Sequence, residues 1–423
     1  MQTQQLKYAS KPLENYINGS HVANENWDLQ KLNDPKTFIP VCSPSNGEII
    51  SYCPLSNKTD VEIAVKSAKA AFESWSNLTV KSRVQILIRF HQLVIKHSEE
   101  LADIIVLEHG KTKSEALAEI AKGNETVEYS LSMPQLIQGK WLEVSRGVQC
   151  NDSKKPVGVV ASIVPFNFPF MVPFWTIPIA LATGNTMIIK PSEKVPLTMN
   201  KVMELFKEAG LPNGVINLVN GTAEAVLAIC DHPDIKAVTF VGTSHVAEIV
   251  SKRCRNLNKR VLALGGAKNH LVAAPDAIIE MTAQDVVNSF TGCSGQRCMA
   301  ASVLLTIGSQ PVLLDEIVQR ASMLTPGSGN GQMGPVIDLA SKEKILKYIN
   351  ESEASGAKIL LDGRKPFGNS NEGFWIGPTV ILHKNKNDRA LHDEIFGPVI
   401  SILEVATKEE AIEFENANPY GNA

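Results

Sequence analysis

The sequence lacks any long uninterrupted apolar run and any strong excess of one charge. The longest apolar stretch, 168–184, contains three prolines, which argues against a membrane-spanning helix. The net charge is −3 over 423 residues and the basic residues are scattered, so the charge pattern does not favour nucleic acid or membrane binding. Residues 1–10 contain no apolar core of the kind that a signal peptide has. We therefore expect a soluble, cytoplasmic protein.

Two common cysteine and glycine motifs are also absent. No CxxC pair indicates a zinc site, and the seven cysteines are an odd number without the spacing of a disulfide framework. This usage is typical of a reducing compartment, and we expect no metal. No GxGxxG motif occurs, which disfavours an ordinary Rossmann dehydrogenase.

From residue 157 onward the chain contains a regular alternation of predicted strands and helices. Such alternation is typical of βαβ units and predicts parallel sheets. Gly265-Gly266 interrupts it and is a candidate boundary between two α/β domains. The first block predicts strands at 157–164, 186–190, 215–219, 236–241 and 261–264, with helices at 170–183, 197–209, 222–230 and 244–257. The second predicts strands at 302–307, 358–361 and 399–404, with helices at 312–322, 341–354 and 407–417.

The part of the chain before this alternation has a different pattern. Short strands and turns are predicted at its start, followed by helical periodicity. Roughly alternating polar and apolar residues over 140–160, with a polar turn at 152–155, predict a hairpin that leads into a buried strand. The helices are predicted at 59–75, 84–97, 101–108 and 116–131.

The stretch 291–300, with the sequence TGCSGQRCMA, is the strongest candidate for the chemistry. It places Cys293 and Cys298 five residues apart, beside Arg297. A thiol is a good nucleophile only as its thiolate, which a nearby positive charge favours, and Arg297 supplies a charge at the right sequence distance. By itself the pattern leaves a second interpretation open, because a cysteine is more often an inert, buried small residue.

Polar residues follow three of the predicted strands, where open α/β sheets bind their ligands. Asn167, between two phenylalanines, offers an amide that can hold an oxyanion, or that bonds the backbone of its own turn. Lys190 and Glu193 suit the hydroxyl groups of a nucleotide ribose, or are solvated charges at a helix start. Thr243 is a candidate N-cap of a helix whose amides can face a pyrophosphate.

Together these motifs resemble the aldehyde dehydrogenase superfamily, from near the start of the chain to its last residue. The resemblance implies an aldehyde dehydrogenase-like α/β fold, with two parallel-sheet domains and a β-hairpin oligomerisation arm. It implies an NAD-binding domain formed by 1–139 and 157–265, the hairpin at 140–156, and a catalytic domain at 266–423 that is truncated at its C-terminus. The stretches that carry it are Pro165-Phe-Asn-Phe-Pro169, Gly184-Asn-Thr186, Lys190-Pro-Ser-Glu193, Phe240-Val-Gly-Thr243, Gly295-Gln-Arg-Cys298 and Glu394-Ile-Phe-Gly-Pro398.

The resemblance also implies a role for each matching residue. Cys298 is the implied nucleophile, and Asn167 with the backbone N–H of Cys298 is the implied oxyanion donor. Cys293 matches no catalytic position and is expected to be a packing residue. NAD is the implied cofactor, and the Glu193 carboxylate favours it over NADP. The positions expected to contact NAD are Val164, Phe166, Lys190, Glu193, Lys194, Thr243, Gly265, Glu394 and Phe396.

Within the superfamily the chain looks most like the methylmalonate-semialdehyde dehydrogenases, a CoA-acylating branch. This implies oxidation of methylmalonate or malonate semialdehyde to propionyl-CoA or acetyl-CoA, with loss of CO₂ and coenzyme A as acyl acceptor. Ala263 stands where hydrolytic relatives carry the glutamate that activates water. A carboxylate elsewhere that replaces this glutamate, and a hydrolytic enzyme releasing a free acid, are the alternatives. The stretches concerned are Gly266-Ala-Lys-Asn-His270, Pro275-Asp-Ala277, Gln296-Arg-Cys-Met-Ala300 and Asn418-Pro-Tyr-Gly-Asn422.

The resemblance has departures in the substrate site and at the end of the chain, and a mild one at Ala247, where a glycine is usual in the nucleotide loop. The branch holds its substrate carboxylate with two arginines; Arg297 matches one, but Lys122 stands at the other and lacks the bidentate fork, unless it is simply a solvated helix residue. Family members are homotetramers that continue beyond the position of Ala423, so we expect weakened self-association. A truncated, inactive relative that acts as a binding or structural subunit is the alternative from a different functional class.

Overall fold

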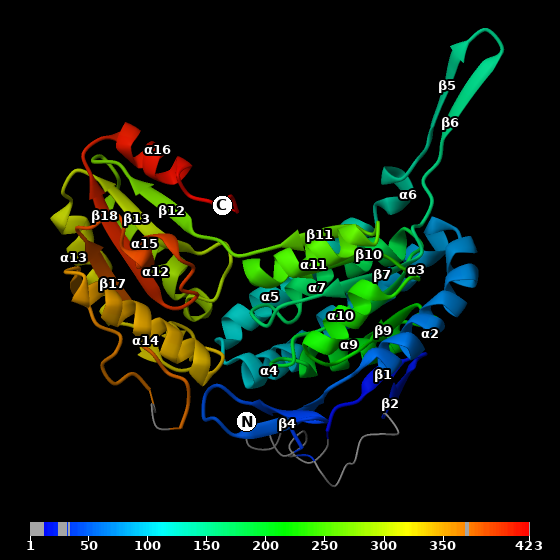
Figure 1. Ribbon diagram of the computed structural model, residues 1–423, viewed down its shortest axis with the longest axis horizontal. Helices are drawn as coiled ribbons and strands as arrows, with labels where there is room; N and C mark the ends of the chain where they lie inside the picture. Colours follow the sequence, from blue (N-terminus) through cyan, green and yellow to red (C-terminus); the bar gives the residue numbers. More distant parts are fainter. Residues whose placement is uncertain (1–11, 24–31, 33, 369–371, 423) are drawn as a thin grey trace. The chain divides into compact units, whose positions relative to one another are not determined.

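The computed structural model describes residues 12–23, 32, 34–368 and 372–422, and the chain divides into two compact units (Figure 1). The main division falls between Gly265 and Gly266. The first unit holds the described residues up to Cys42, with Ile49–Ile105 and Leu117–Gly265; the second holds Ser43–Glu48, Val106–Ala116 and the described residues from Gly266 onward. The two short segments of the second unit differ from the expectation that 1–139 belongs to one domain, because most of their contacts are with residues far along the chain.

The first unit is built on a seven-stranded sheet. Its first five strands are parallel, as the alternation predicts, and the last two add an antiparallel edge. The fourth strand in this order is buried at every residue, as expected for a parallel strand covered on both faces. In sheet order the strands are β11 (Arg260–Leu264), β10 (Ile235–Val241), β7 (Val159–Ile163), β8 (Thr186–Lys190), β9 (Ile216–Leu218), β1 (Asn15–Ile17) and β2 (Ser20–Val22).

Amphipathic helices supply the core against this sheet. Val61 and Val65 of α2 belong to one buried cluster with Ile188 of β8 and Val250 of α11, and all four side chains are fully buried. The predicted helix over 170–183 is in fact two short ones, because prolines remove backbone N–H donors there, and one of them lies in the first turn of the second helix. The helices are α2 (Lys58–Asn77), α3 (Val80–Lys96), α4 (Ser98–His109), α5 (Lys113–Ser130), α6 (Met133–Leu136), α7 (Met171–Phe174), α8 (Ile177–Ala182), α9 (Leu197–Glu208), α10 (Ala223–Asp231) and α11 (Ser244–Asn256).

The second unit has a five-stranded sheet of its own, parallel except for its last strand. Two of its strands, at 269–273 and 379–383, and the helix at 279–291 have no counterpart in the sequence prediction. In sheet order the strands are β12 (Asn269–Ala273), β13 (Ala301–Ile307), β18 (Val399–Val405), β17 (Thr379–His383) and β16 (Lys358–Leu361). The helices are α12 (Ile279–Thr291), η1 (Gly292–Gly295), α13 (Pro311–Ser322), α14 (Leu339–Ala354), α15 (Arg389–His392) and α16 (Lys408–Asn416). Outside the two large sheets, β14 (Thr325–Pro326) pairs with β15 (Gln332–Met333) in the second unit. In the first unit, β3 (Phe38–Cys42) pairs with β4 (Ile49–Pro54).

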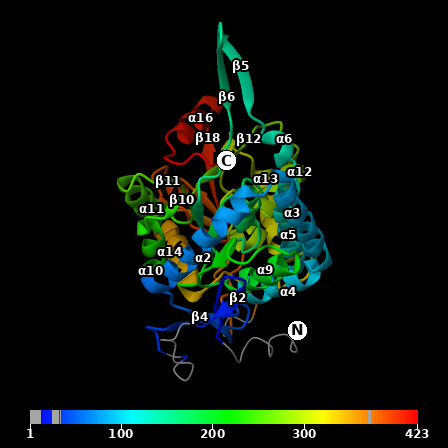
Figure 2. The same ribbon diagram turned by 90° about the vertical axis from the view of Figure 1, so that its right-hand side faces the viewer.

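A hairpin of β5 (Lys140–Ser145) and β6 (Val148–Asp152) projects from the first unit (Figures 1 and 2). Its turn lies at Arg146-Gly147, where Gly147 has φ 78°, and not at the predicted 152–155, which leads out of the second strand. Both strands are exposed along their whole length. An isolated hairpin is marginally stable, and Leu142 and Val144, two residues apart on β5, expose apolar side chains on one face of it. Among the helices of the described residues, none has the length and apolar character needed to cross a bilayer.

Candidate active site

The carboxyl ends of four neighbouring strands of the first unit carry the residues that the sequence associates with a nucleotide. Val164 follows β7, Lys190 ends β8, Thr243 follows β10 and Gly265 follows β11. These strands are adjacent in the sheet, in the order β11-β10-β7-β8, so the four positions lie along one sheet edge. This is the edge at which open α/β sheets bind their ligands.

Lys190 and Glu193 differ from the alternative interpretation, in which both are solvated charges at a helix start. The Lys190 side chain is 4% exposed, and its Nζ lies 2.8 Å from the Pro191 carbonyl oxygen and 3.6 Å from Glu193 Oε2. Glu193 is 30% exposed, so its carboxylate is held by a buried ammonium yet open to a ligand. Beside them, Lys194 Nζ lies 5.3 Å from the centroid of the Phe166 ring.

The edge is also shaped for a phosphate-bearing ligand at the start of α11. Thr243 is the N-cap, and its Oγ1 accepts the N–H of Val246 at 3.5 Å. Gly265 follows the next strand, β11, and an added Cβ there would lie 3.0 Å from Ser244 Oγ. The close approach of these two segments leaves little room for a side chain at Gly265. A helix N-terminus, a buried lysine and a carboxylate along one edge fit a dinucleotide.

Asn167 lies in the loop after β7, with only 3% of its surface exposed. The end of this loop is fixed by Glu119 of α5, whose Oε1 accepts the N–H groups of Phe170 at 2.8 Å and Met171 at 3.2 Å. A buried amide on a loop held by a carboxylate is pre-organised, as an oxyanion donor needs to be.

In the second unit, a left-handed turn precedes the candidate nucleophile. The values of φ are 48° at Cys293, 55° at Ser294 and 71° at Gly295, directly after α12. Left-handed backbone is unfavourable for residues with a side chain, so the surrounding contacts must stabilise it. Gly295 is needed for a second reason, because a Cβ there would lie 1.9 Å from the Gly397 carbonyl oxygen.

This contact gives a prediction for stability. Gly295→Ala is expected to lower the free energy of unfolding by about 3 kcal/mol or more, because backbone strain and steric overlap add. The matched control is Gly356→Ala, where φ is 91° but nothing lies within 4 Å of the added Cβ, so we expect a loss of about 1 kcal/mol from strain alone. Urea unfolding of both variants measures the difference; equal losses would mean that the Gly397 contact has no energetic weight.

Cys298 lies just beyond the turn and is partly exposed. Its carbonyl oxygen accepts the side-chain amides of Asn269 at 2.8 Å and Asn422 at 3.0 Å. Burial is the largest influence on its thiol and raises the pKa above the usual value. The Arg297 guanidinium, which the sequence suggests as the activating charge for this thiol, bonds to Glu115 of α5 and to Cys293 Sγ.

Cys298, Arg297, Glu394 and Phe396 line one pocket, so the structure brings these four predicted residues together. Glu394 Oε1 accepts the Ala267 N–H at 3.2 Å, and burial raises the pKa of its carboxyl group. The pocket therefore combines a thiol, a guanidinium and a carboxyl group that holds its proton more tightly than usual.

Two of the predicted substrate residues have partners of their own. Arg297 Nη2 lies 3.2 Å from Glu115 Oε1, and its Nε donates to Cys293 Sγ at 3.4 Å. Lys122, on α5, is 65% exposed and pairs with Glu125 at 2.5 Å. Lys122 therefore has the surroundings of a solvated helix residue, the alternative considered for it.

Sequence reasoning missed Glu115 and Lys268. The motif Thr112-x-x-Glu115 indicates a helix start, but no local pattern shows that this carboxylate reaches a loop almost 180 residues away. Lys268 is completely buried, and burial lowers its pKa to about 7, opposed by the nearby charges of Asp393 and Glu394. A lysine between Ala267 and Asn269 carries no sequence signal of burial.

Comparison with known proteins agrees with this architecture. The chain matches the aldehyde dehydrogenase family over residues 31–423. It is 41% identical over 418 residues to malonate-semialdehyde dehydrogenase 1 of Geobacillus thermodenitrificans, covering 97% of this chain and 84% of that protein. It is similar to the crystal structure of methylmalonate-semialdehyde dehydrogenase from Oceanimonas doudoroffii, with a TM-score of 0.93, 37% identity, and coverage of 97% and 84%.

A further similar structure is an NAD⁺ complex of an aldehyde dehydrogenase from Bacillus cereus, with a TM-score of 0.92 and 29% identity. That match covers 98% of this chain and 84% of the other. The fold class inferred from the sequence, with two parallel-sheet α/β parts and a hairpin, is confirmed. The chain belongs to the aldehyde dehydrogenase family.

Proposed function

We propose that this chain is an NAD-dependent, CoA-acylating dehydrogenase of malonate or methylmalonate semialdehyde. The observation that carries the proposal is the single pocket lined by Cys298, Arg297 and Glu394, since it places a nucleophile beside a fixed cation. A cation there suits an aldehyde that also bears a carboxylate. The names of the similar proteins, malonate- and methylmalonate-semialdehyde dehydrogenase, support the same substrate class.

The chemical roles follow from the residues. The Cys298 thiolate adds to the aldehyde carbon, and the Asn167 amide with the Cys298 N–H stabilises the resulting oxyanion. NAD, when bound, accepts the hydride that leaves this carbon. Cys298 is then left as a thioester. The thiol of coenzyme A loses its proton, attacks the thioester carbonyl and releases Cys298 as its thiolate. The β-carboxylate leaves as CO₂, and a proton takes its place on the α-carbon.

Ala263 on β11 is the reason for choosing acyl transfer over hydrolysis. Its methyl group packs against the core of the first unit and cannot deprotonate water. Without a base for water, the thioester persists until a better nucleophile arrives, and the thiol of coenzyme A is such a nucleophile. Glu394 in the Cys298 pocket is the carboxylate closest at hand among the lining residues to serve as the base in a hydrolytic enzyme.

The first unit supplies the cofactor site in this proposal. Lys190 and Glu193 hold the hydroxyl groups of the adenosine ribose, and the start of α11 at Thr243 faces the pyrophosphate. Glu193 repels a 2′-phosphate and so favours NAD over NADP. The β5–β6 hairpin is proposed as a self-association arm, because its exposed apolar side chains suit a second protein surface.

The test is a substrate panel with and without coenzyme A. With NAD and malonate semialdehyde alone, we expect one burst of NADH per Cys298 followed by slow turnover. Coenzyme A should raise the steady rate at least about tenfold, because it resolves the thioester. A steady rate that is the same in water as with coenzyme A assigns hydrolysis, through Glu394 or another carboxylate. NAD binding without any burst assigns a binding or structural subunit.

A further inference from the structure

Glu115 lies in the first turn of α5 and has two sets of partners. Its Oε2 accepts the Thr112 backbone N–H at 3.0 Å and the Thr112 hydroxyl at 2.9 Å, while the Glu115 N–H lies 3.3 Å from Thr112 Oγ1. This reciprocal arrangement is a capping box. It satisfies the helix start and fixes the rotamer of the Glu115 side chain.

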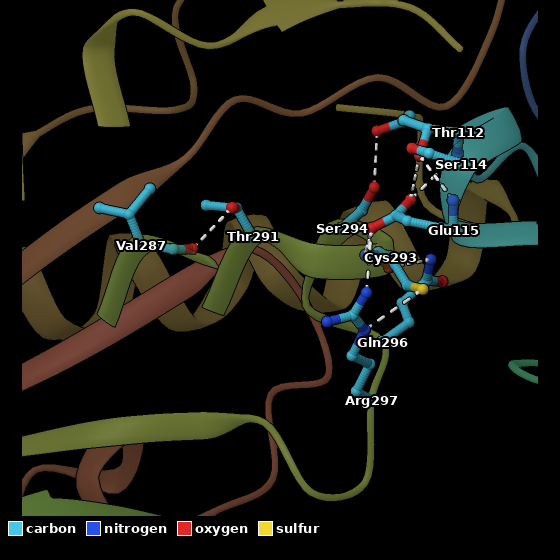
Figure 3. Close-up of polar contacts among 10 residues, drawn as sticks. Thr112, Ser114, Glu115, Val287, Thr291, Cys293, Ser294, Gln296 and Arg297 are labelled. Atoms are coloured by element: carbon cyan, nitrogen blue, oxygen red, sulfur yellow. Dashed lines mark hydrogen bonds and ion pairs between the residues drawn. The ribbon is translucent and has the colours of Figure 1, made fainter. Parts of the chain in front are cut away.

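The other oxygen of Glu115 faces the nucleophile loop (Figure 3). Its Oε1 accepts the Cys293 N–H at 2.6 Å and the Arg297 Nη2 at 3.2 Å. Arg297 Nε donates in turn to Cys293 Sγ at 3.4 Å. One carboxylate therefore receives four donors, two from the helix cap and two from the loop that carries Cys298.

The bond to Cys293 falls at the strained part of the loop. Cys293 begins the left-handed turn, is 2% exposed, and cannot exchange a lost hydrogen bond for water. A charge-assisted bond to its amide is stronger than a neutral one and stabilises this backbone conformation. The guanidinium is confined as well, because a Cβ at Gly292 would lie 2.3 Å from Arg297 Nη1.

We propose that Glu115 is a positioning residue of this enzyme, holding the turn before Cys298 and the Arg297 guanidinium in their reactive arrangement. This rests on the proposed function in one respect, that Cys298 is the nucleophile and Arg297 the substrate cation. We call the two hydrogen bonds that Glu115 Oε1 accepts from Cys293 and Arg297 the clamp. Because Arg297 is the immediate neighbour of Cys298, a shift of the clamp moves both groups. Glu115 itself does not react with the aldehyde.

The informative variant is Glu115→Gln, which keeps the size of the side chain. A glutamine has one acceptor oxygen, so its NH₂ must face either the Thr112 pair of donors or the Cys293 and Arg297 pair. With an uncharged aldehyde such as propanal, kcat should fall at least about tenfold while the KM for NAD stays within twofold, because the loss is in nucleophile alignment. With malonate semialdehyde the aldehyde KM should rise as well, because Arg297 is no longer oriented.

The chain offers a matched control in Glu410→Gln. Glu410 occupies the same position of α16, where Thr407 Oγ1 accepts its N–H at 3.2 Å and its Oε2 accepts the Ala406 N–H at 2.7 Å. It also pairs with Lys386, so the control loses a capping carboxylate and an ion pair together. Both kinetic constants should stay within twofold of those of the unchanged protein.

Hydrogen exchange over residues 288–300 tests the clamp without relying on activity. Glu115→Gln should speed exchange at the Cys293 amide at least about tenfold, since this amide loses its acceptor, whereas Glu410→Gln should not. Glu115→Asp, which keeps both oxygens on a shorter arm, should give intermediate values and serves if the glutamine variant does not fold. Unchanged exchange and an unchanged kcat in either Glu115 variant would overturn the proposal. If the protein without substitutions forms no NADH, the proposed function is overturned instead. The hydrogen-exchange rates then decide whether Glu115 positions the loop.

Discussion

Replacing Cys298 with serine is expected to lower kcat for aldehyde oxidation on the order of 10⁴-fold, by comparison with other covalent nucleophiles. A serine hydroxyl stays protonated at neutral pH, whereas even a thiol whose pKa is raised by burial supplies some thiolate. NAD affinity should remain, because most of the positions expected to contact NAD, from Val164 to Gly265, are in the first unit. Steady-state kinetics and NAD titration of the variant measure the two effects.

The matched control for this variant is Cys150→Ser. Cys150 is an exposed cysteine of β6, so the same atom is exchanged away from the pocket, and kcat should not change. Mass spectrometry without coenzyme A adds a direct readout, because the acyl group should be found on the peptide that contains Cys298. Acylation of another cysteine, or a Cys298→Ser enzyme with more than a tenth of normal activity, would contradict the assignment.

Asn167→Ala should lower kcat by about 10²- to 10³-fold, the loss seen when one oxyanion donor is removed elsewhere. The loss should appear in kcat and not in the KM for NAD, because the amide acts on charge that develops during the reaction. Asn167→Asp should be at least as severe, since a carboxylate repels the oxyanion. Kinetics of both variants with propanal isolate this effect from substrate-carboxylate binding.

Loss of a buried amide can also destabilise the fold, and Asn200→Ala controls for that. Asn200 is buried on α9 and its Nδ2 donates to the Pro196 carbonyl oxygen at 2.9 Å. Its replacement should lower the free energy of unfolding by about 1–2 kcal/mol and leave kcat within twofold. Should Asn200→Ala reduce kcat as much as Asn167→Ala does, the Asn167 effect would be structural.

Most of the parallel strands were predictable because they are continuous apolar runs that end in polar residues. β8, for example, has the predicted bounds Thr186–Lys190. β12 escaped prediction because its pattern is polar at Asn269 and His270 and partly exposed beyond them, as an edge strand allows. The sequence did contain a signal for the break between α7 and α8, because prolines interrupt the predicted helix. The prediction gave more weight to the continuous apolar run and placed one helix there.

The candidate site was predictable where a short motif contains its own geometry. Thr243 caps α11 through a bond to Val246, only three residues away, so the local sequence is enough to predict it. Glu394 is farther along the chain, but it lines the Cys298 pocket within the same compact unit. Arg297 shows the limit. Its closeness to Cys298 in sequence indicated activation, but its guanidinium turns toward Glu115 and Cys293. The pairing of Glu115 with Cys293 joins residues 178 positions apart. No local sequence pattern predicts such a pairing, because it forms only when the chain has folded.

The contact between Gly295 and Gly397 has a consequence for how this enzyme can be diversified. The two glycines come from different motifs. A Cβ on Gly295 would overlap the Gly397 backbone, and a Cβ on Gly397 would lie 2.4 Å from Ile345 Cδ1, so that side chain would have to move. Libraries that randomise the loop around Cys298 for new aldehydes should therefore hold Gly295 constant, together with the proposed catalytic and substrate residues Arg297 and Cys298. Recombination with a related gene should exchange the Cys298 and Glu394 motifs as one block, since separating them joins two surfaces that were never selected together.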